Sequence, residues 1–189
     1  MDSMSPSRPA LRRELLGARS QMQEAERTRA DALIRAALLL KIETALGARA
    51  GDAVIASYWP IQGEPDLRPL WNRWREIALP VVVGPAHPLR FARWRPGMAM
   101  SVGPHRVPAP AHHEWLEPNL LIIPCLGFHV DARGKCFRLG YGGGYYDRTL
   151  QAHDRPTVGV AYAAGRLSEF KPEVHDVPLD TIVTQTGTW

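Results

Sequence analysis

The sequence predicts an α/β protein with three layers, in which helices cover both faces of a mostly parallel central sheet. Short apolar runs alternate with helical segments along the chain, which is the pattern of such folds. Several of these runs are apolar at every position, which is typical of strands buried on both faces of a parallel sheet. We find no internal repeat and no domain boundary, so we expect one domain over residues 1–189, with residues 1–7 as a disordered lead-in.

Two helices are expected first. Pro9 suits the first turn of a helix that continues to about Arg19. Ser20 and Gln23 fit a capping box that opens a second helix, which ends near Leu46. We expect this second helix to be amphipathic and to pack through four apolar residues, Leu33, Ala37, Leu40 and Leu46.

Beyond Gly51 the pattern changes to strands and shorter helices. Helices are expected at about 67–76 and over 145–152, and the proline- and glycine-rich segment 96–118 is expected to be irregular. Strands are expected in the apolar runs at 53–59, 77–83, 89–94, 119–124, 157–163 and 180–184.

The charge balance points to anionic partners. The formal net charge is +4, with a pI near 9.4, and most of the positive charge is arginine, which suits bidentate contact with phosphate or carboxylate. The segment 84–113 contains no acidic residue. It contains four arginines, Arg90, Arg93, Arg95 and Arg106. This segment predicts a pocket for a small polyanion, a nucleic-acid surface, or a solvated loop.

Membrane and secreted classes are not favoured by the sequence. The longest apolar run, ALIRAALLL, is interrupted by Arg35 and is too short for a membrane span. The N-terminal residues lack the apolar core of a signal peptide. Cys125 and Cys136 are expected to be reduced thiols, which fits a cytoplasmic protein.

The segment RLGYGGGYYDRTL (138–150) carries the strongest functional signal. Four glycines, Gly140, Gly142, Gly143 and Gly144, precede a helix that begins near Tyr145. Glycine lets consecutive backbone amides converge on a ligand, and a helix N-terminus adds partial positive charge. The loop is neither a P-loop nor a dinucleotide fingerprint. It therefore predicts an anion site or, alternatively, a turn that needs glycine for its geometry alone.

Two charged residues flank this loop. Arg138 precedes it and can clamp a phosphate bidentately. Asp147 lies in the next helical turn and is a candidate ligand for a magnesium ion shared with that phosphate. Asp147 also has two simpler alternatives, capping the helix or pairing with Arg148.

The segment LLIIPCLGF followed by RLGYGGGYYDRTL closely resembles the signature of the 5-formyltetrahydrofolate cyclo-ligase family. The similarity extends to RPALRREL, SYWPIQGEPD and TVGVAYAAGRL, and so covers nearly the whole chain. The resemblance implies a three-layer α/β/α fold and an ATP- and Mg²⁺-dependent conversion of 5-formyltetrahydrofolate to 5,10-methenyltetrahydrofolate, with release of ADP and phosphate. In that reaction the formyl oxygen is phosphorylated and N10 closes the ring, so charge stabilisation and alignment matter more than a nucleophilic side chain.

The resemblance also implies roles for individual residues. The ATP-binding residues would be Arg8, Arg12, Arg138, Gly140, Gly142, Gly143, Gly144, Tyr145 and Asp147, with Arg138 also catalytic and Asp147 also the metal ligand. The folate-binding residues would be Tyr58, Trp59, Glu64 and Tyr146. Some of them have a simpler alternative: Arg8 and Arg12 as charges on an exposed helix, Tyr58 and Trp59 as core residues, and Glu64 as a solvated loop charge.

Arg8 stands where the family usually has lysine, and two further departures affect details of the site. His105 and Ala109 replace an aromatic residue and an acid or amide, and the segment 127–140 is about two residues longer than usual. We expect a monomer that acts on small molecules without nucleic acid or membrane. Two alternatives stay open: a sugar-phosphate isomerase or CoA transferase type of enzyme, and a nucleic-acid-binding protein.

Overall fold

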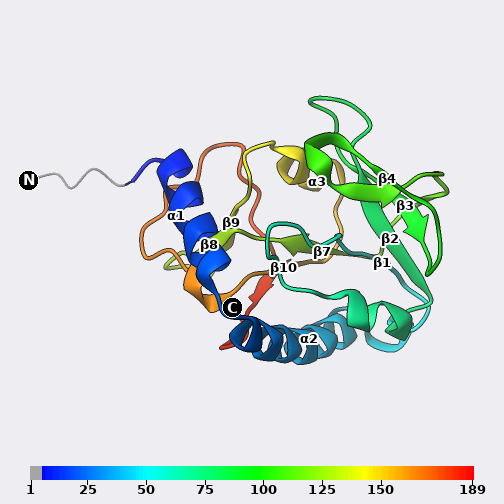
Figure 1. Ribbon diagram of the computed structural model, residues 1–189, viewed down its shortest axis with the longest axis horizontal. Coiled ribbons are helices and arrows are strands. Elements are labelled where there is room, and N and C mark those ends of the chain that lie inside the picture. The colour runs from blue at the N-terminus through cyan, green and yellow to red at the C-terminus, as the bar shows by residue number, and fades with distance from the viewer. Residues whose placement is uncertain (1–5) are drawn as a thin grey trace, which may run out of the picture.

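The computed structural model describes residues 6–189, and a seven-stranded sheet forms its centre (Figure 1). The strand order is β11-β10-β7-β1-β2-β3-β6. Five strands are parallel: β1 (Val54–Ala56), β2 (Glu76–Val81), β7 (Leu120–Pro124), β10 (Thr157–Val160) and β11 (Thr181–Val183). β3 (Arg90–Trp94) and β6 (Trp115–Leu116) add an antiparallel edge. The predicted mostly parallel α/β fold is confirmed.

Helices lie on both sides of this sheet. The longer ones are α1 (Arg8–Gln21), α2 (Glu24–Leu46) and α3 (Tyr145–Ala152). Four 3-10 turns complete the described helices: η1 (Gly47–Arg49), η2 (Arg68–Arg73), η3 (Pro104–Arg106) and η4 (Ala163–Gly165). Of the predicted lead-in over residues 1–7, residues 1–5 lie outside the described residues. Residues 6 and 7 are described and come directly before α1. Within the described range, none of the helices combines the length and apolar character that a membrane crossing requires.

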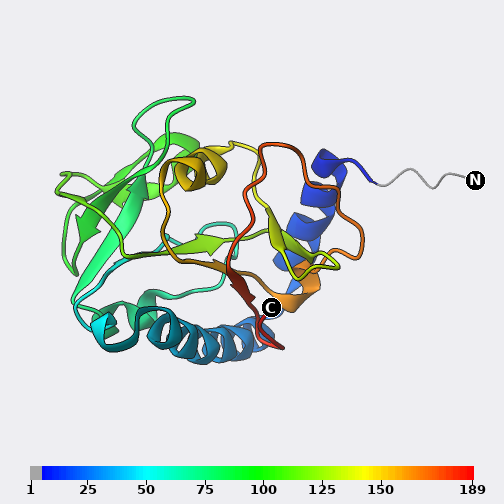
Figure 2. The same ribbon diagram turned by 180° about the vertical axis from the view of Figure 1, so that it is seen from behind.

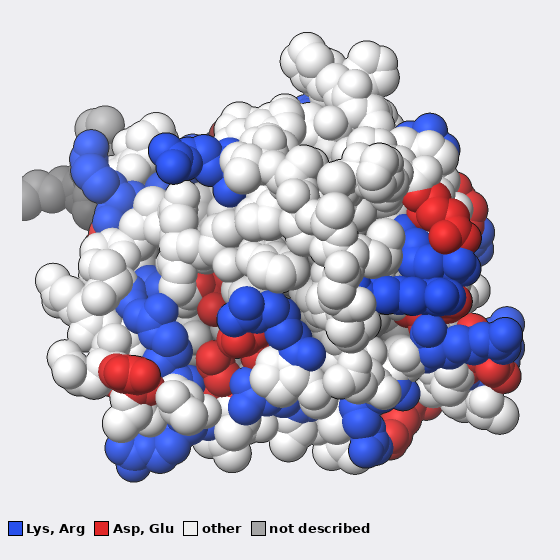
Figure 3. All heavy atoms as spheres, turned by 45° about the vertical axis from the view of Figure 1, so that its right-hand side comes forward, with Lys and Arg blue, Asp and Glu red and all other residues white. Residues whose placement is uncertain are grey.

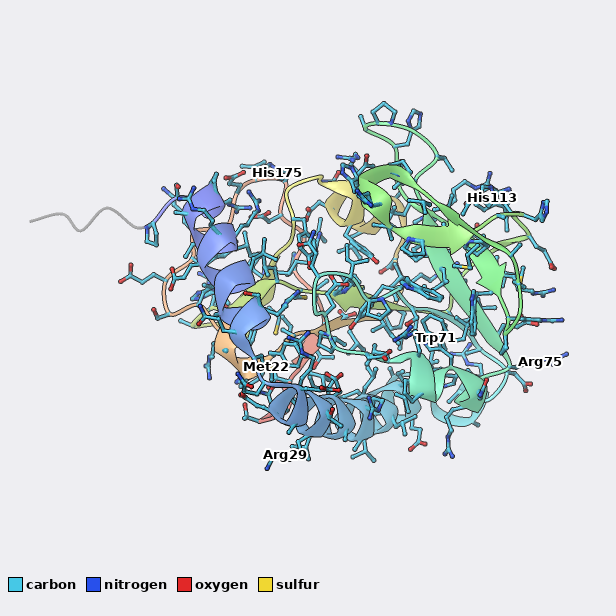
Figure 4. The ribbon with its side chains drawn as sticks, in the orientation of Figure 1. Met22, Arg29, Trp71, Arg75, His113 and His175 are labelled. Atoms are coloured by element: carbon cyan, nitrogen blue, oxygen red, sulfur yellow. The ribbon has the colours of Figure 1, made fainter. Side chains whose placement is uncertain are left out.

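Alternation of side chains divides the core into two layers. Ile55, Ile77 and Leu120 belong to the layer under α2 and η2, where Trp71 of η2 lies near the sheet (Figure 4). Their neighbours Ala56, Ala78 and Leu121 belong to the opposite layer. The opposite face is covered by α3 and by a hairpin of β8 (Gly127–Val130) and β9 (Cys136–Leu139), as Figure 2 shows from behind. Both faces of the parallel strands are therefore occupied.

The buried face of α2 differs from the predicted one. Leu33 and Leu40 are 55% and 65% exposed, so their assignment to the packed face was wrong. Leu46 is buried as predicted, and Ala37 packs at the edge of the core. The buried row repeats every four residues: Ala30, Ile34, Leu38, Ile42 and Leu46. Because the middle of α2 is apolar almost all round, the sequence alone does not select this row.

Three local predictions were also wrong. Ser20 lies inside α1 and donates to Gly17 O, and Gln23 makes no side-chain cap bond, so there is no capping box. The helix predicted over 67–76 is the short turn η2, because residues from Glu76 onward pair with β1 as β2. The segment expected to be irregular forms the ribbon of β4 (Met100–Val102) and β5 (Pro108–Pro110), followed by β6. Prolines at both ends of β5 hide its strand signal.

Both cysteines are free and buried, as the expectation of reduced thiols required. Cys125 follows β7, and Cys136 begins β9. The chain between β8 and β9 forms a tight turn, in which Asp131 Oδ1 accepts hydrogen bonds from Arg133 N and Lys135 N at 2.9 and 2.8 Å.

The buried row on α2 predicts different outcomes for two leucines on the same helix. Leu38→Ala is expected to lower the free energy of unfolding by about 2–5 kcal/mol, because it opens a cavity in the core. Leu40→Ala removes the same atoms from an exposed position and is expected to change it by less than about 0.5 kcal/mol. Urea unfolding of both variants measures the difference, and equal losses would contradict the assigned face.

Candidate active site

A cavity of about 1060 Å³ opens where β1, β2 and β7 end, with Tyr58, Val82 and Pro124 in its lining. These strands are parallel, so their carboxyl ends meet at one edge, which is where α/β sheets place ligands. The other walls come from α1, the β4–β5 ribbon, the loop before α3, and a loop before β11 that includes His175 (Figures 1 and 4). All the residues predicted for ATP and folate binding line this cavity.

Helix α1 presents three arginines to this edge. Arg8, Arg12 and Arg19 are spaced by four and seven residues and therefore fall on one stripe of the helix. Arg8 pairs with Asp176, and its Nε lies 3.1 Å from Glu173 Oε1. Arg12 Nε donates to Gly140 O at 2.9 Å. Arg8 and Arg12 are thus held at the cavity wall by other elements, which does not fit charges on an exposed helix.

The glycine loop needs glycine at two positions. Gly142 and Gly144 have φ angles of 98° and 67°, which disfavour any residue with a Cβ. A Cβ on Gly142 would also lie 3.2 Å from Arg12 Cζ. Gly144 is the N-cap of α3, so the loop delivers its backbone to a helix N-terminus at the cavity.

Arg138 and Asp147 form a largely buried ion pair beside this loop. Arg138 Nη2 lies 2.7 Å from Asp147 Oδ1, and the side chains are 5% and 20% exposed. Val177 anchors both, since its carbonyl accepts from Arg138 Nη1 at 3.1 Å and its amide donates to Asp147 Oδ1 at 3.3 Å. Asp147 therefore pairs with Arg138. Arg148 instead donates to Gly143 O at 2.9 Å and to His87 O at 3.3 Å.

Glu64 is a buried carboxyl in the lining of the same cavity. It is 5% exposed, so it is not a solvated loop charge. Its Oε2 accepts from Ile61 N at 3.0 Å, and its Oε1 accepts from the Tyr141 hydroxyl at 2.9 Å. Burial raises the pKa of Glu64 from 4.5 to about 7. Near neutral pH this carboxyl can therefore occupy either protonation state.

Two residues that the sequence does not single out contact this carboxyl directly or through a neighbour. Tyr141 donates to Glu64, and Arg19 Nη1 donates to the Tyr141 hydroxyl at 3.0 Å. The seven-residue spacing of Arg12 and Arg19 on α1 was a signal that could have found Arg19. No local pattern identifies Tyr141 as a partner of Glu64, because 77 residues separate them.

Aromatic side chains complete the lining. Tyr58 is buried and donates to Pro65 O at 2.8 Å. Trp59 is half-buried and meets Trp71 edge-on at 6.0 Å, so it both packs on the core and lines the cavity. Across the cavity, His105 meets Tyr145 edge-on at 5.7 Å. Burial raises the pKa of Tyr146, which therefore stays neutral and contributes an apolar ring with a hydroxyl.

The arginines of the acid-free segment do not form one free basic surface. Arg93 pairs with Glu76 and Glu114, and Arg95 Nη2 lies 3.2 Å from Glu76 Oε1. Arg90 lies over the Trp115 ring at 3.9 Å. Blue and red side chains accordingly lie side by side at the right of Figure 3, the side on which β3 lies. Of the four arginines, Arg106 lines the cavity.

The fold and the cavity together define an α/β protein with a large cavity at the carboxyl edge of a parallel sheet, which is where such folds bind ligands. Residues 4–185 match the model of the 5-formyltetrahydrofolate cyclo-ligase family. The chain belongs to this family.

Individual relatives agree with this assignment. The chain is 30% identical over 200 residues to a 5-formyltetrahydrofolate cyclo-ligase of Mycolicibacterium smegmatis, covering 96% of this chain and 95% of the relative. It is 29% identical over 156 residues to the Escherichia coli K12 cyclo-ligase, covering 71% and 79%. The solved 5,10-methenyltetrahydrofolate synthetase of Aquifex aeolicus superposes with a TM-score of 0.76 at 27% identity, covering 96% of this chain and 91% of that one. A 5,10-methenyltetrahydrofolate synthetase of Mycoplasma pneumoniae shares the fold, with a TM-score of 0.74 at 24% identity, covering 95% and 99%.

The raised pKa of Glu64 predicts how stability depends on pH. Between 4.5 and about 7 the folded state binds more protons at Glu64 than the unfolded state, so this contribution is present below 4.5 and is lost as pH rises through about 7. Glu64→Gln should remove that loss, which is at most about 3 kcal/mol. Urea unfolding between about pH 5 and pH 8 measures the two slopes.

The matched control is Glu43→Gln, which removes a carboxyl from an exposed position on α2. This control is expected to keep the wild-type slope. Identical slopes for the wild type and Glu64→Gln would show that Glu64 does not bind the extra proton.

Proposed function

We propose that this chain converts 5-formyltetrahydrofolate to 5,10-methenyltetrahydrofolate in the cavity at the sheet edge, and that it consumes ATP and releases ADP and phosphate. Family membership supports the reaction. The observation that carries the residue assignment is that one cavity joins the arginines of α1, the glycine loop and the buried Glu64. Residues from segments far apart in the sequence thus border a single space that is large enough for two substrates to meet.

In this proposal the two substrates occupy different walls. ATP lies with its phosphates against the glycine loop, where backbone amides, Arg8, Arg12 and Arg138 surround them. The pterin of the folate lies against Tyr58, Trp59 and Tyr146. The Glu64 carboxylate accepts hydrogen bonds from adjacent N–H groups of the pterin. This division places the formyl group between the walls, facing the terminal phosphate.

The protein supplies alignment and charge. A formamide is a poor electrophile, because its nitrogen donates electrons into the carbonyl. Attack of the formyl oxygen on the γ-phosphate breaks the bond to ADP and forms an iminium-like phosphate ester. N10 then adds to the formyl carbon and loses its proton, and phosphate leaves as the methenyl bridge forms. Arg138 stabilises the charge on the transferring phosphoryl group.

Magnesium fits one wall of the cavity. No group of three or more His, Cys, Asp or Glu side chains within the described residues forms a complete metal site. Mg²⁺ bound to ATP needs only one or two protein carboxylates besides phosphate oxygens, and Asp147, which lines the cavity, is the residue that would hold it. When bound, the ion supplies further neutralisation of phosphate charge. The carboxylate's Oδ1 already contacts Arg138, so Asp147 would connect the ion to that arginine.

The other classes considered from the sequence have less support. Family membership argues against an isomerase or CoA transferase. A nucleic-acid surface would need the arginines of 84–113 to be available, and Arg93 and Arg95 pair with acids instead. The cytoplasmic location and the monomeric state remain predictions.

The proposed reaction has a direct optical test. Enzyme, 5-formyltetrahydrofolate, ATP and Mg²⁺ should produce the near-ultraviolet absorbance of the methenyl product, and omission of ATP should abolish it.

Arg138→Ala should lower kcat by about 100-fold or more, because it removes charge stabilisation from the transferring group. Arg138→Lys is the conservative partner, which keeps the charge and loses the fork. Circular dichroism verifies folding, since Arg138→Ala leaves Asp147 without its ion-pair partner. Absence of product from folded wild-type protein would refute the reaction, and near-wild-type kcat in Arg138→Ala would refute the role of Arg138.

The loop geometry generates a second kinetic prediction. Gly142→Ala should raise KM for ATP about tenfold, because it strains a positive φ and pushes Arg12 from the phosphate wall. KM for 5-formyltetrahydrofolate should change much less. Gly97→Ala is matched for strain, since Gly97 has a φ of 81° and no atom within 4 Å of an added Cβ. It should lower stability by about 1 kcal/mol and leave KM for ATP unchanged. Equal effects of both variants on KM would show that strain alone is responsible.

A further inference from the structure

We propose that Tyr141 and Arg19 are positioning residues that orient the Glu64 carboxyl and keep it ionised for folate binding. This inference rests on the proposed function and adds two residues to it. Neither residue is among those that the family resemblance assigns. Their role is to act through Glu64, with no chemistry of their own.

Three side chains from three separate elements form one hydrogen-bonded chain. Arg19 comes from α1, Tyr141 from the glycine loop, and Glu64 from the loop after β1. Arg19 Nη1 lies 3.0 Å from the Tyr141 oxygen, and that oxygen lies 2.9 Å from Glu64 Oε1. A tyrosine of the nucleotide wall therefore touches the acid of the folate wall.

The chemistry of arginine fixes the direction of this chain. A guanidinium only donates hydrogen bonds, so the Tyr141 oxygen accepts from Arg19. The single phenolic proton is then left for Glu64, which must be the acceptor. An oxygen that accepts a bond from a cation also becomes a better donor. Tyr141 is thus set to stabilise the ionised form of Glu64.

Arg19 is held firmly enough to act as the fixed end. Arg19 is 6% exposed, and its Nη2 donates a hydrogen bond to Cys125 O at 2.9 Å. Cys125 is the first residue after β7. Arg19 lies seven residues, about two helical turns, after Arg12 on the same stripe of α1. It does not line the large cavity. This separation argues for action through Tyr141, because Arg19 does not face the space assigned to the substrates.

The surroundings of Glu64 explain why such a relay is needed. Burial opposes ionisation of this carboxyl, while the bonds from Ile61 N and Tyr141 and the charge of Arg19 favour it. The other titratable groups that interact with Glu64 are Tyr58, Tyr146 and Cys125, and none of them supplies a positive charge. Among the described residues, Arg19 is the cation whose charge lowers the pKa of Glu64. Without the relay, the carboxyl would hold its proton to higher pH.

Tyr141→Phe tests the relay because it removes only the hydroxyl. KM for 5-formyltetrahydrofolate should rise about tenfold near neutral pH, with KM for ATP changing less than about twofold. The acidic limb of kcat/KM for the folate should move about one pH unit to higher pH. A blank without enzyme at each pH corrects for spontaneous cyclisation of the folate.

A double-mutant cycle separates action through Glu64 from direct action on the substrate. In the Glu64→Gln background, Tyr141→Phe should change the folate KM by less than about twofold, because its target is gone. A full tenfold effect in that background would overturn the proposal.

For the outer residue, Arg19→Met should shift the acidic limb as Tyr141→Phe does, and Arg19→Lys should restore most of the wild-type profile. An identical profile for all three proteins would remove Arg19 from the relay.

Tyr162→Phe is the matched control for loss of a buried tyrosine–carboxyl bond. The Tyr162 hydroxyl donates to Asp31 Oδ1 at 2.7 Å, outside the large cavity. This variant should lose stability and keep the acidic limb in place. If Tyr141→Phe loses stability in the same way and also keeps the limb, Tyr141 has a structural role alone and the proposal fails.

An infrared titration keeps this test independent of turnover. The C=O stretch of a protonated carboxyl, taken as wild type minus Glu64→Gln, follows the proton on Glu64 directly. Tyr141→Phe should move the midpoint about one pH unit upward, and an unchanged midpoint would refute the relay. Absence of the methenyl product would instead refute the proposed function and leave this measurement intact.

Discussion

The alternation of apolar side chains along the parallel strands is the constraint on which the rest of the structure depends. Because Ile55 and Ala56 point to opposite faces, both faces must be covered, and α2 on one side and α3 with the β8–β9 hairpin on the other provide the cover. Parallel pairing also brings all the carboxyl ends to one edge. The faces are closed by packing, so that edge is where loops from many parts of the chain can surround a cavity.

Burial of charge gives this cavity its chemical character. Two of its arginines are paired with acids within the protein, Arg8 with Asp176 and Arg138 with Asp147. Such pairs keep guanidinium groups in defined positions before a substrate arrives, because an unpaired buried charge is costly. In the proposed function, the phosphates of ATP would therefore meet arginines that are already oriented. Glu64 is different, because its hydrogen-bond partners among the described residues are neutral donors, and burial raises its pKa to about 7.

How much of this could be read from the sequence depended on the range of the interactions. Strands that are apolar at each position were predicted at β1, β7 and β10, because burial on both faces leaves a local signal. The glycine loop was predictable because positive φ at Gly142 and Gly144 demands that residue type. The face of α2 was not, since the apolar residues surround the helix and only the sheet beneath it selects Leu38 over Leu40. The β4–β5 ribbon was missed for a related reason, as its pairing overrides local proline content.

The sequence by itself determined the strand pattern, the loop that must be glycine, and the residue types of a candidate anion site, because each follows from local backbone geometry or from periodic burial. Tertiary structure alone decided which charges meet. Arg138 rather than Arg148 became the partner of Asp147, and a tyrosine of the glycine loop met an acid 77 positions earlier in the chain. Such contacts depend on how α1, the loop after β1 and the glycine loop converge at the sheet edge. That convergence is a product of the packed strands, and no local spacing pairs Tyr141 with Glu64.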